Sequence, residues 1–259
     1  MKKRFLFFSI FGSLLLAGFV LLALWFPKQY QVPILTYHSI APVWFEPLNN
    51  VQPEHFVQQM AYLRQQGYVV LSLSQFIDAQ RSGRAHDRKS VVITFDDGYE
   101  NNYAAAYPVL KKYGFPATIF VEVAHLGIPG YFTWEQAKDM DAHGIDIESH
   151  TMVGAYLPEL SHEEAVSEIT ESKRVLEKEL GHPVRFLAYP VGGFSEDVKQ
   201  IVRQAGYAVA VTTNRGYAWV PRDLYEVKRI RVKDSDGDLQ LWLKLSGYYN
   251  FFRGSKNPS

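Results

Sequence analysis

The sequence predicts an α/β fold in which about seven parallel strands close, or nearly close, into a (β/α) barrel. Two observations carry this prediction. Segments of strand type alternate with segments of helix type along the chain, which is typical of a parallel sheet with helical crossovers. Polar side chains also stand at or just beyond the strand ends, where such barrels place their chemistry. These residues are His38, Asp96, Asp97, His150, Tyr189 and Arg231.

The expected elements follow one another in a regular order. Pro53 suits the first turn of a helix, and Gly67 ends that helix. Capping boxes at Thr133 and Ser161 begin two later helices. The expected strands lie at residues 32–38, 68–73, 91–95, 117–121, 145–150, 185–189, 207–212 and 227–232. The expected helices lie at residues 53–67, 73–81, 101–114, 133–144, 161–180 and 195–205.

The composition sets limits on function. With 259 residues, of which 47% are hydrophobic, the chain can form one large domain. Lys+Arg and Asp+Glu both number 27, so the formal net charge is +0 and no nucleic-acid partner is expected. The absence of Cys excludes disulfides, thiol catalysis and thiolate metal ligands.

The N-terminal segment predicts an uncleaved signal anchor at residues 1–27, followed by one folded domain at residues 28–259. Three basic residues near the start precede the uncharged run 5–26. That run is long enough to cross a hydrocarbon core, which needs about 20 residues. The basic flank is expected in the cytoplasm, so the protein is expected to span the cell membrane once with its domain outside. The alternative, a cleaved signal peptide, is disfavoured because no small-x-small cleavage site follows.

The most informative stretch is 91–98, an apolar run of strand type that ends in Asp96 and Asp97. Two adjacent carboxylates at a strand tip repel each other and lose hydration, so a bound cation is the simplest compensation. One carboxylate would then bind the cation, and the other would be free to act as a base. Asp97-Gly98 is also a hairpin signal. However, the alanine-rich segment 101–114 indicates a helix, which favours a strand–loop–helix unit.

Over roughly residues 32–232 the chain resembles the polysaccharide deacetylase family, the NodB-homology domain of carbohydrate esterase type. The motifs that carry the resemblance are T-F-D-D-G at 94–98 and S-H-T at 149–151. Two further motifs, Y-H at 37–38 and A-Y-P at 188–190, are similar to those of one subgroup. The resemblance implies a distorted or incomplete (β/α) barrel. It also implies metal-dependent removal of acetyl groups from N-acetylated sugars of peptidoglycan or exopolysaccharide.

The resemblance further implies roles for individual residues. Asp96 would be the general base that takes a proton from the attacking water. Asp97 and His150 would bind the divalent metal, with zinc expected before cobalt, nickel or manganese. The backbone N–H of Val191 would help to hold the tetrahedral oxyanion. The expected substrate-binding residues are His38, Tyr189, Val191 and Arg231.

The chain departs from the family pattern after His150, because the second histidine of that motif is replaced by Gly154. The metal would then have two protein ligands, whereas catalytic zinc sites usually have three. A distant histidine would have to complete the set, and the candidates are His125, His143 and His162. The arginine that orients the base in many relatives is also absent. We expect Arg231 to pair with Asp96 in its place, and we expect Arg229 to point to the opposite face.

Two functions of different class remain open. The first is a membrane-anchored, extracytoplasmic N-deacetylase of glycans. The second is a degenerate deacetylase fold that binds glycans or a partner without hydrolysis. Retention of Asp96 favours the enzyme, because a pure binder needs no base, whereas Gly154 favours the binding module.

Overall fold

The computed structural model describes residues 30–42, 49–84, 86–214 and 223–253. Contacts divide the chain into residues 1–31 and Val32–Ser259, and the fold lies in the second unit. Its strands are β1 Ile34–Tyr37, β2 Val69–Leu71, β3 Ser90–Phe95, β4 Ala117–Val121, β5 Ile145–Ser149, β6 Phe186–Ala188, β7 Val209–Thr212, β8 Val227–Lys228 and β9 Ile230–Arg231. Its α-helices are α2 Pro53–Gln65, α3 Leu73–Arg81, α4 Tyr107–Tyr113, α5 Trp134–Asp141, α6 His162–Leu180, α7 Glu196–Gln204 and α8 Asp238–Leu245.

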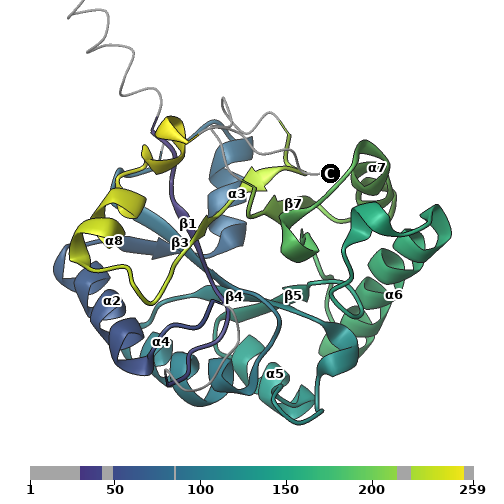
Figure 1. Ribbon diagram of the computed structural model, residues 1–259, viewed down its shortest axis with the longest axis horizontal. Helices are drawn as coiled ribbons and strands as arrows, with labels where there is room; N and C mark the ends of the chain where they lie inside the picture. The colour runs from purple at the N-terminus through teal and green to yellow at the C-terminus, as the bar shows by residue number, and fades with distance from the viewer. Residues whose placement is uncertain (1–29, 43–48, 85, 215–222, 254–259) are drawn as a thin grey trace, which may run out of the picture. The chain divides into compact units, whose positions relative to one another are not determined.

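The strands form a nearly closed parallel barrel (Figure 1). Their order is β8-β7-β6-β5-β4-β3-β1-β9, and β2 pairs with β3 beside this path. Although β8 and β9 stand at opposite ends of the order, Arg229 alone separates them in the chain. The chain therefore leaves β7 through β8, turns at Arg229 and joins β1 through β9. This arrangement confirms the predicted distorted (β/α) barrel in the described residues.

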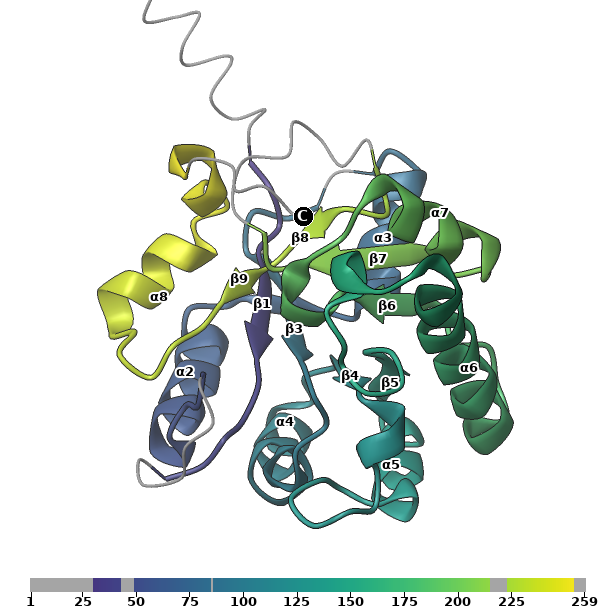
Figure 2. The same cartoon turned by 45° about the vertical axis from the view of Figure 1, so that its right-hand side comes forward.

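The helices begin and end where the sequence signals stand, with two differences. Thr133 and Ser161 both form the expected capping boxes. The helix expected at 101–114 starts instead as a π-helical turn and continues as α4, with Pro108 in the first turn of α4. Helix α8 was not expected from the sequence. Figure 2 shows the helices lying around the outside of the strands.

Burial explains why the strands are apolar throughout. Every residue of β1, β3, β4 and β7 is buried, as expected when helices cover one face of a sheet and the barrel interior covers the other. Because the strands are parallel, their carboxyl ends meet at one end of the barrel. The polar residues that follow these ends are therefore brought together by the fold itself.

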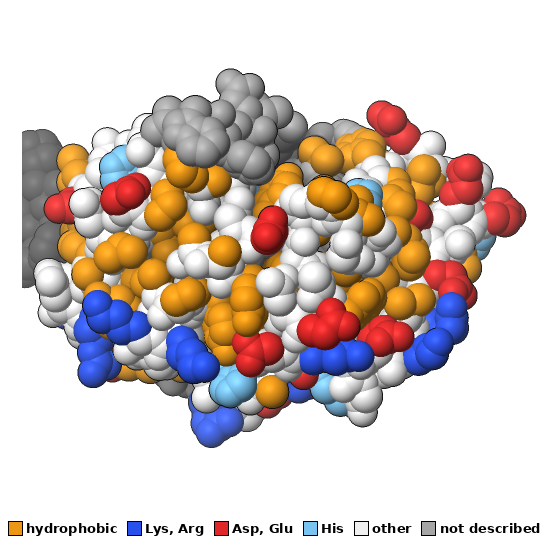
Figure 3. All heavy atoms as spheres, turned by 90° about the horizontal axis from the view of Figure 1, so that it is seen from below, with side chains coloured by type: hydrophobic (Ala, Val, Ile, Leu, Met, Phe, Trp, Pro, Cys, Tyr) orange, Lys and Arg blue, Asp and Glu red, His pale blue; other side chains and the backbone are white. Residues whose placement is uncertain are grey.

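Two further features concern membrane-spanning helices and surface charge in the described residues. In the described ranges, no helix combines the length and the apolar character needed to cross a bilayer. The anchor predicted at 1–27 lies outside the described residues. Figure 3 shows Lys and Arg side chains together with Asp and Glu side chains on one face of the molecule. Neither sign of charge covers that face.

Candidate active site

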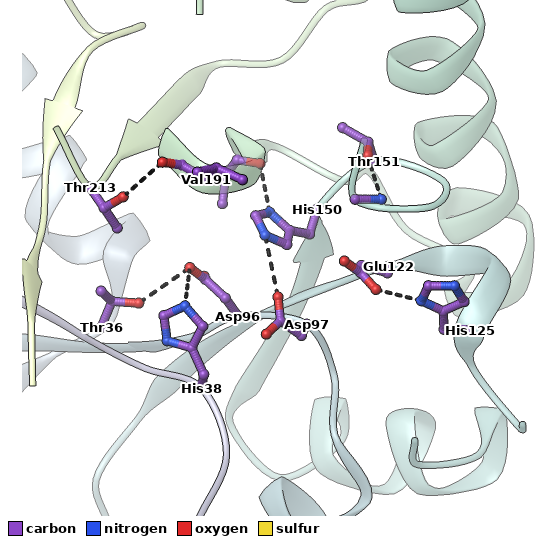
Figure 4. A network of polar contacts seen from close by, with 12 residues as sticks. Thr36, His38, Asp96, Asp97, Glu122, His125, His150, Thr151, Val191 and Thr213 are labelled. Carbon is purple, nitrogen blue, oxygen red and sulfur yellow. Dashed lines mark hydrogen bonds and ion pairs between the residues drawn. The ribbon is translucent and has the colours of Figure 1, made fainter. Parts of the chain in front are cut away.

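Neighbouring strand ends bring the expected base and the expected metal ligands together (Figure 4). Asp96 and Asp97 directly follow β3, His150 directly follows β5, and β4 lies between these two strands. His38 directly follows β1, which pairs in parallel with β3 up to the last residue of each strand. His38 Nε2 lies 3.9 Å from Asp96 Oδ2. Four of the residues predicted from strand ends therefore share one site.

The loops after β3, β5 and β6 each contain a non-glycine residue with a left-handed backbone. The φ angles are 75° at Asp97, 67° at Thr151 and 58° at Val191. This conformation costs an L-residue roughly 1–2 kcal/mol, and it is most unusual for β-branched residues such as Thr151 and Val191. Strained residues of this kind cluster at functional sites, where the surrounding structure holds them in place. The strain therefore marks the loops after β3, β5 and β6 as candidate functional loops.

Asp96 is buried and is kept ionised by Arg229. Arg229 Nη1 and Nη2 donate to the two carboxylate oxygens at 2.6 and 2.8 Å, and Nη1 also donates to the Thr36 hydroxyl at 3.2 Å. Burial alone would raise the pKa of Asp96, because it disfavours the charged form. The positive charge of Arg229, helped by His150 and His38, outweighs burial and holds the pKa of Asp96 well below its usual range.

The expectation that Arg231 pairs with Asp96 is wrong. Arg231 Nη1 donates to Asn49 Oδ1 at 2.9 Å, and Arg229 makes the pair with Asp96. Residues two apart on a regular strand share a face, so Arg229 should not have been assigned to the opposite face. In addition, the strand breaks at Arg229, where the chain passes from β7 to β1. The Arg229 side chain is fully buried there, with its guanidinium 5.2 Å from the centre of the Phe120 ring.

His150 and Asp97 are arranged as ligands of a cation would be. His150 Nδ1 is 2.8 Å from the backbone oxygen of Ala188, and since that oxygen can only accept, Nδ1 carries the proton. In a neutral imidazole, the Nε2 lone pair then faces Asp97 Oδ1 at 3.5 Å. Two acceptors in this position repel each other unless a proton or a metal ion lies between them, and the Nδ1 contact is the usual support of a metal-bound histidine. These residues therefore fit a divalent cation.

Glu122 is the site residue that the sequence analysis missed. It directly follows β4, and its N–H donates to the backbone oxygen of Asp97 at 3.4 Å. Burial raises the pKa of Glu122. His150 and His125 oppose this rise, and the charge of Asp97 adds to it. An acidic residue directly after a buried strand is the same signal that singled out the two acids after β3. That signal was available in the sequence.

Gly154 lies against Glu122. Its φ is 69°, and a β-carbon built on it would lie 1.8 Å from Glu122 Oε1. The backbone N–H groups of Met152 and Val153 donate to Glu168, which holds this loop in position. The space next to Gly154, where a side chain at that position would begin, is therefore filled by the carboxylate of Glu122.

Of the three distant histidines considered as replacement ligands, only His125 contacts the site residues. His125 Nδ1 is hydrogen-bonded to Glu122 Oε2, and the His125 ring packs against Tyr131 with 4.9 Å between ring centres. His143 contacts Asp139, and His162 contacts Asp197, each through an exposed side chain. In the described parts of the chain, no three His, Cys, Asp or Glu side chains are grouped so that they could hold a metal ion together.

The remaining predicted residues lie at different depths. His38 is buried, and burial lowers its pKa against the opposing charges of Asp96 and Asp97. Its Nδ1 has no hydrogen-bond partner in the described part of the chain. The Tyr189 hydroxyl donates to the backbone oxygen of Tyr225 at 3.0 Å, so it is used inside the protein. Val191 is 76% exposed, at the left-handed turn after β6.

Comparison with known proteins gives consistent matches. The family model for polysaccharide deacetylase matches residues 83–210. The Bacillus subtilis (strain 168) protein named "Putative polysaccharide deacetylase YxkH" is 37% identical over 205 residues, which cover 79% of this chain and 72% of the relative. A poly-beta-1,6-N-acetyl-D-glucosamine N-deacetylase of Staphylococcus aureus (strain N315) is 28% identical, with 76% of this chain and 79% of the relative covered. The solved structure of the Streptococcus pyogenes deacetylase PplD in complex with acetate superimposes with a TM-score of 0.77 at 31% identity, over 83% of this chain and 97% of that chain.

Proposed function

The chain belongs to the polysaccharide deacetylase family, whose members hydrolyse N-acetyl amide bonds, and from this premise we propose that it is a metal-dependent N-deacetylase of an extracytoplasmic glycan. The observation that carries the proposal is the ionised Asp96 beside Asp97 and His150. A buried carboxylate held ionised by Arg229, next to two ligand-type side chains, is the constellation needed for attack by water on an amide.

The residues of the chain divide the chemistry among them. A divalent ion bound by Asp97 and His150 would supply Lewis-acid polarisation of the acetamide and of the attacking water. Asp96 accepts the proton of that water. Arg229 keeps the Asp96 carboxylate charged and fixes its orientation through two hydrogen bonds. Because Arg229 also makes Asp96 a weak base, the water has to be acidified strongly for the transfer to occur.

Other groups bind the substrate and the developing charge in this proposal. The Val191 N–H donates to the oxyanion, and the strained turn presents it at the strand end. His38, whose Nε2 lies 3.9 Å from Asp96, contacts the sugar. Tyr189 contributes indirectly, because its side chain is hydrogen-bonded inside the protein and holds the turn that carries Val191. Arg231 binds the glycan at a position farther from Asp96.

We place the enzyme at the cell membrane, held by residues 1–27, with residues 28–259 as the catalytic domain on the outer side. The uncharged run 5–26 behind three basic residues supports this placement. The glycan is N-acetylated, either peptidoglycan or an exopolysaccharide. Similarity to a poly-beta-1,6-N-acetyl-D-glucosamine N-deacetylase supports the exopolysaccharide. Zinc is the proposed metal, before cobalt, nickel or manganese.

A second candidate function, a glycan-binding module without turnover, is favoured by Gly154 alone. It requires a metal set that remains incomplete. The buried pair of Asp96 and Arg229 favours hydrolysis, because a binder has no use for a charged carboxylate that costs desolvation.

Acetate release by the purified full-length chain tests the proposal. Chitooligosaccharide, poly-beta-1,6-N-acetyl-D-glucosamine and peptidoglycan serve as substrates, with zinc added and with a chelator added. We expect acetate from at least one substrate, loss with chelator, and none from the Asp96→Asn variant. Binding of these glycans without acetate release under any metal would support the binding module instead.

A further inference from the structure

Glu122 occupies the strand end between the two expected metal ligands. Asp97 follows β3, Glu122 follows β4 and His150 follows β5, and these three strands are neighbours in the barrel. Backbone hydrogen bonds tie them: Glu122 N donates to Asp97 O at 3.4 Å, and His150 N donates to Val121 O at 2.8 Å. The Glu122 side chain thus starts between the other two by the geometry of the sheet. Figure 4 shows Glu122 on the same side of the barrel end as Asp97 and His150.

Gly154 is the feature that makes room for this carboxylate. A β-carbon at Gly154 would come within 1.8 Å of Glu122 Oε1 and within 2.7 Å of its Cδ, closer than non-bonded atoms approach. The residue that deprives the motif of its second histidine therefore also admits the Glu122 side chain. A histidine at position 154 is therefore incompatible with the present conformation of the Glu122 side chain. This mutual exclusion is what a replacement of one ligand by another requires.

His125 supports the carboxylate from the far side. Its Nδ1 is hydrogen-bonded to Glu122 Oε2, while Oε1 is the oxygen that lies beside Gly154. The Tyr131 ring packs on His125 and stacks on Tyr99, with 4.9 and 5.4 Å between ring centres. A carboxylate that uses one oxygen on an oriented histidine keeps its other oxygen for a metal ion. Hydrogen-bonded support of this kind is usual behind metal ligands.

We propose that Glu122 is the third protein ligand of the divalent cation, in place of the missing second histidine, with His125 as its positioning residue. The inference rests on the proposed metal-dependent function. The ligand set is then Asp97, Glu122 and His150, two carboxylates and one imidazole. These side chains would come together around the ion, since no three such side chains of the described residues are grouped as a metal site without it. Carboxylate and imidazole donors suit zinc and also manganese or cobalt, and three protein ligands leave a position open for water.

A purely structural role for Glu122 makes a different prediction. If Glu122 only pairs with His125, its replacement by Gln changes stability and leaves metal affinity as it was. If Glu122 is a ligand, its replacement lowers metal affinity directly. The two roles are therefore separated by a binding measurement, which does not depend on turnover.

Zinc affinity of the full-length chain, purified in detergent, is measured by competition with a chromophoric chelator. Cobalt is bound in parallel, because its visible spectrum reports the ligand set. We expect Glu122→Gln to weaken zinc binding by at least about 100-fold and to change the cobalt spectrum, and His125→Gln to weaken zinc binding by about 10–100-fold. Glu171→Gln, the same charge change on the surface of α6, is the control and should match the parent. Zinc affinity of Glu122→Gln within tenfold of the parent overturns the proposal.

A second pair of variants moves Glu122 without altering it. Gly154→Asn adds a β-carbon against the Glu122 carboxylate, and Asn tolerates the left-handed backbone there. Gly67→Asn is matched to it, because Gly67 has φ 71° and open space around its missing β-carbon. We expect Gly154→Asn to lose zinc affinity and Gly67→Asn to keep it. Equal zinc affinity in both variants would contradict the proposal even if Glu122→Gln failed to fold.

The outcomes separate this inference from the proposed function. If the parent protein binds zinc through Glu122 but releases no acetate, the ligand assignment holds and the proposed deacetylase function is rejected. If the parent protein releases acetate and Glu122→Gln keeps its zinc affinity, the ligand assignment is rejected and the proposed deacetylase function holds.

Discussion

Replacement of Arg229 by Met should reverse the pH dependence of stability that Asp96 contributes. Arg229 and Asp96 are at most 3% exposed at their side chains and share two short hydrogen bonds. Loss of one partner of such a buried pair costs about 3–5 kcal/mol, because the other charge remains buried and unpaired. Protonation of Asp96 relieves this cost. The variant should therefore keep Asp96 as the neutral acid at pH values below neutral.

The magnitude follows from the pKa of the buried carboxyl. In the parent, the folded-state pKa of Asp96 lies below that of the unfolded chain, about 3.9. Its stabilising contribution is present above that pH and is lost as the pH falls toward the folded-state pKa. Without Arg229, burial raises the pKa by about 3 units, to about 7. The contribution of the neutral acid is then lost as the pH rises from about 4 to about 7, and the loss amounts to about 4 kcal/mol at 1.36 kcal/mol per unit.

Denaturant unfolding of Arg229→Met and of the parent between pH 4.5 and 7.5 measures this difference. We expect the deficit of the variant to grow with pH, and its acetate release, if any, to appear only at the alkaline end. Arg231→Met is the matched control, since Arg231 is only partly buried and contacts Asn49, and its deficit should stay below about 1 kcal/mol at every pH. A deficit of Arg229→Met that does not change with pH would refute the reasoning, as would the same trend in Arg231→Met.

Two further predictions concern the site, and a third concerns the N-terminal segment. Asp96→Asn should abolish acetate release and leave the zinc content near that of the parent, whereas Asp97→Ala should lose both; metal analysis decides, and equal zinc loss in the two variants would remove the roles of base and ligand. Gly154→His should not raise zinc occupancy, because the backbone there is left-handed and Glu122 fills the space, so a gain of zinc in calorimetric titration would contradict the structure. Residues 1–27 should remain on the mature protein, and N-terminal sequencing of material from the membrane fraction would show a start beyond residue 20 if they are cleaved.

The sequence was sufficient for the barrel and for the residues directly after its strands. Continuous apolar runs predict buried parallel strands, and Asp96, Asp97 and His150 follow such runs directly. Because parallel strands share one carboxyl end, these residues had to meet once the fold was correct. Helix α8 was missed. Its apolar residues do not follow a single helical face, since Leu241 and Leu245 are buried whereas Leu239, Trp242 and Leu243 are exposed.

Local sequence patterns could not identify the residue that pairs with Asp96. Arg229 and Arg231 stand on one short stretch, and strand alternation gives both the same face. The choice between them depends on where the stretch leaves β7 and joins β1, and this closure is a property of the whole barrel. Arg229 stands at the break, with its side chain buried inside the barrel, whereas Arg231 lies beyond it and contacts Asn49.

The relation between Glu122 and Gly154 shows how a missing motif residue can mislead. Read along the chain, glycine at position 154 removes a ligand and points to a defective site. In the fold, the same glycine lies against a carboxylate from the neighbouring strand end, 32 positions earlier in the chain. Exchange of an imidazole for a carboxylate would add one negative charge to the ligand set, which strengthens the hold on a divalent cation and weakens the cation as a Lewis acid. A less acidified water demands more of the base that deprotonates it, so the buried pair of Asp96 and Arg229 would set the rate in such a site more than in one with two histidines.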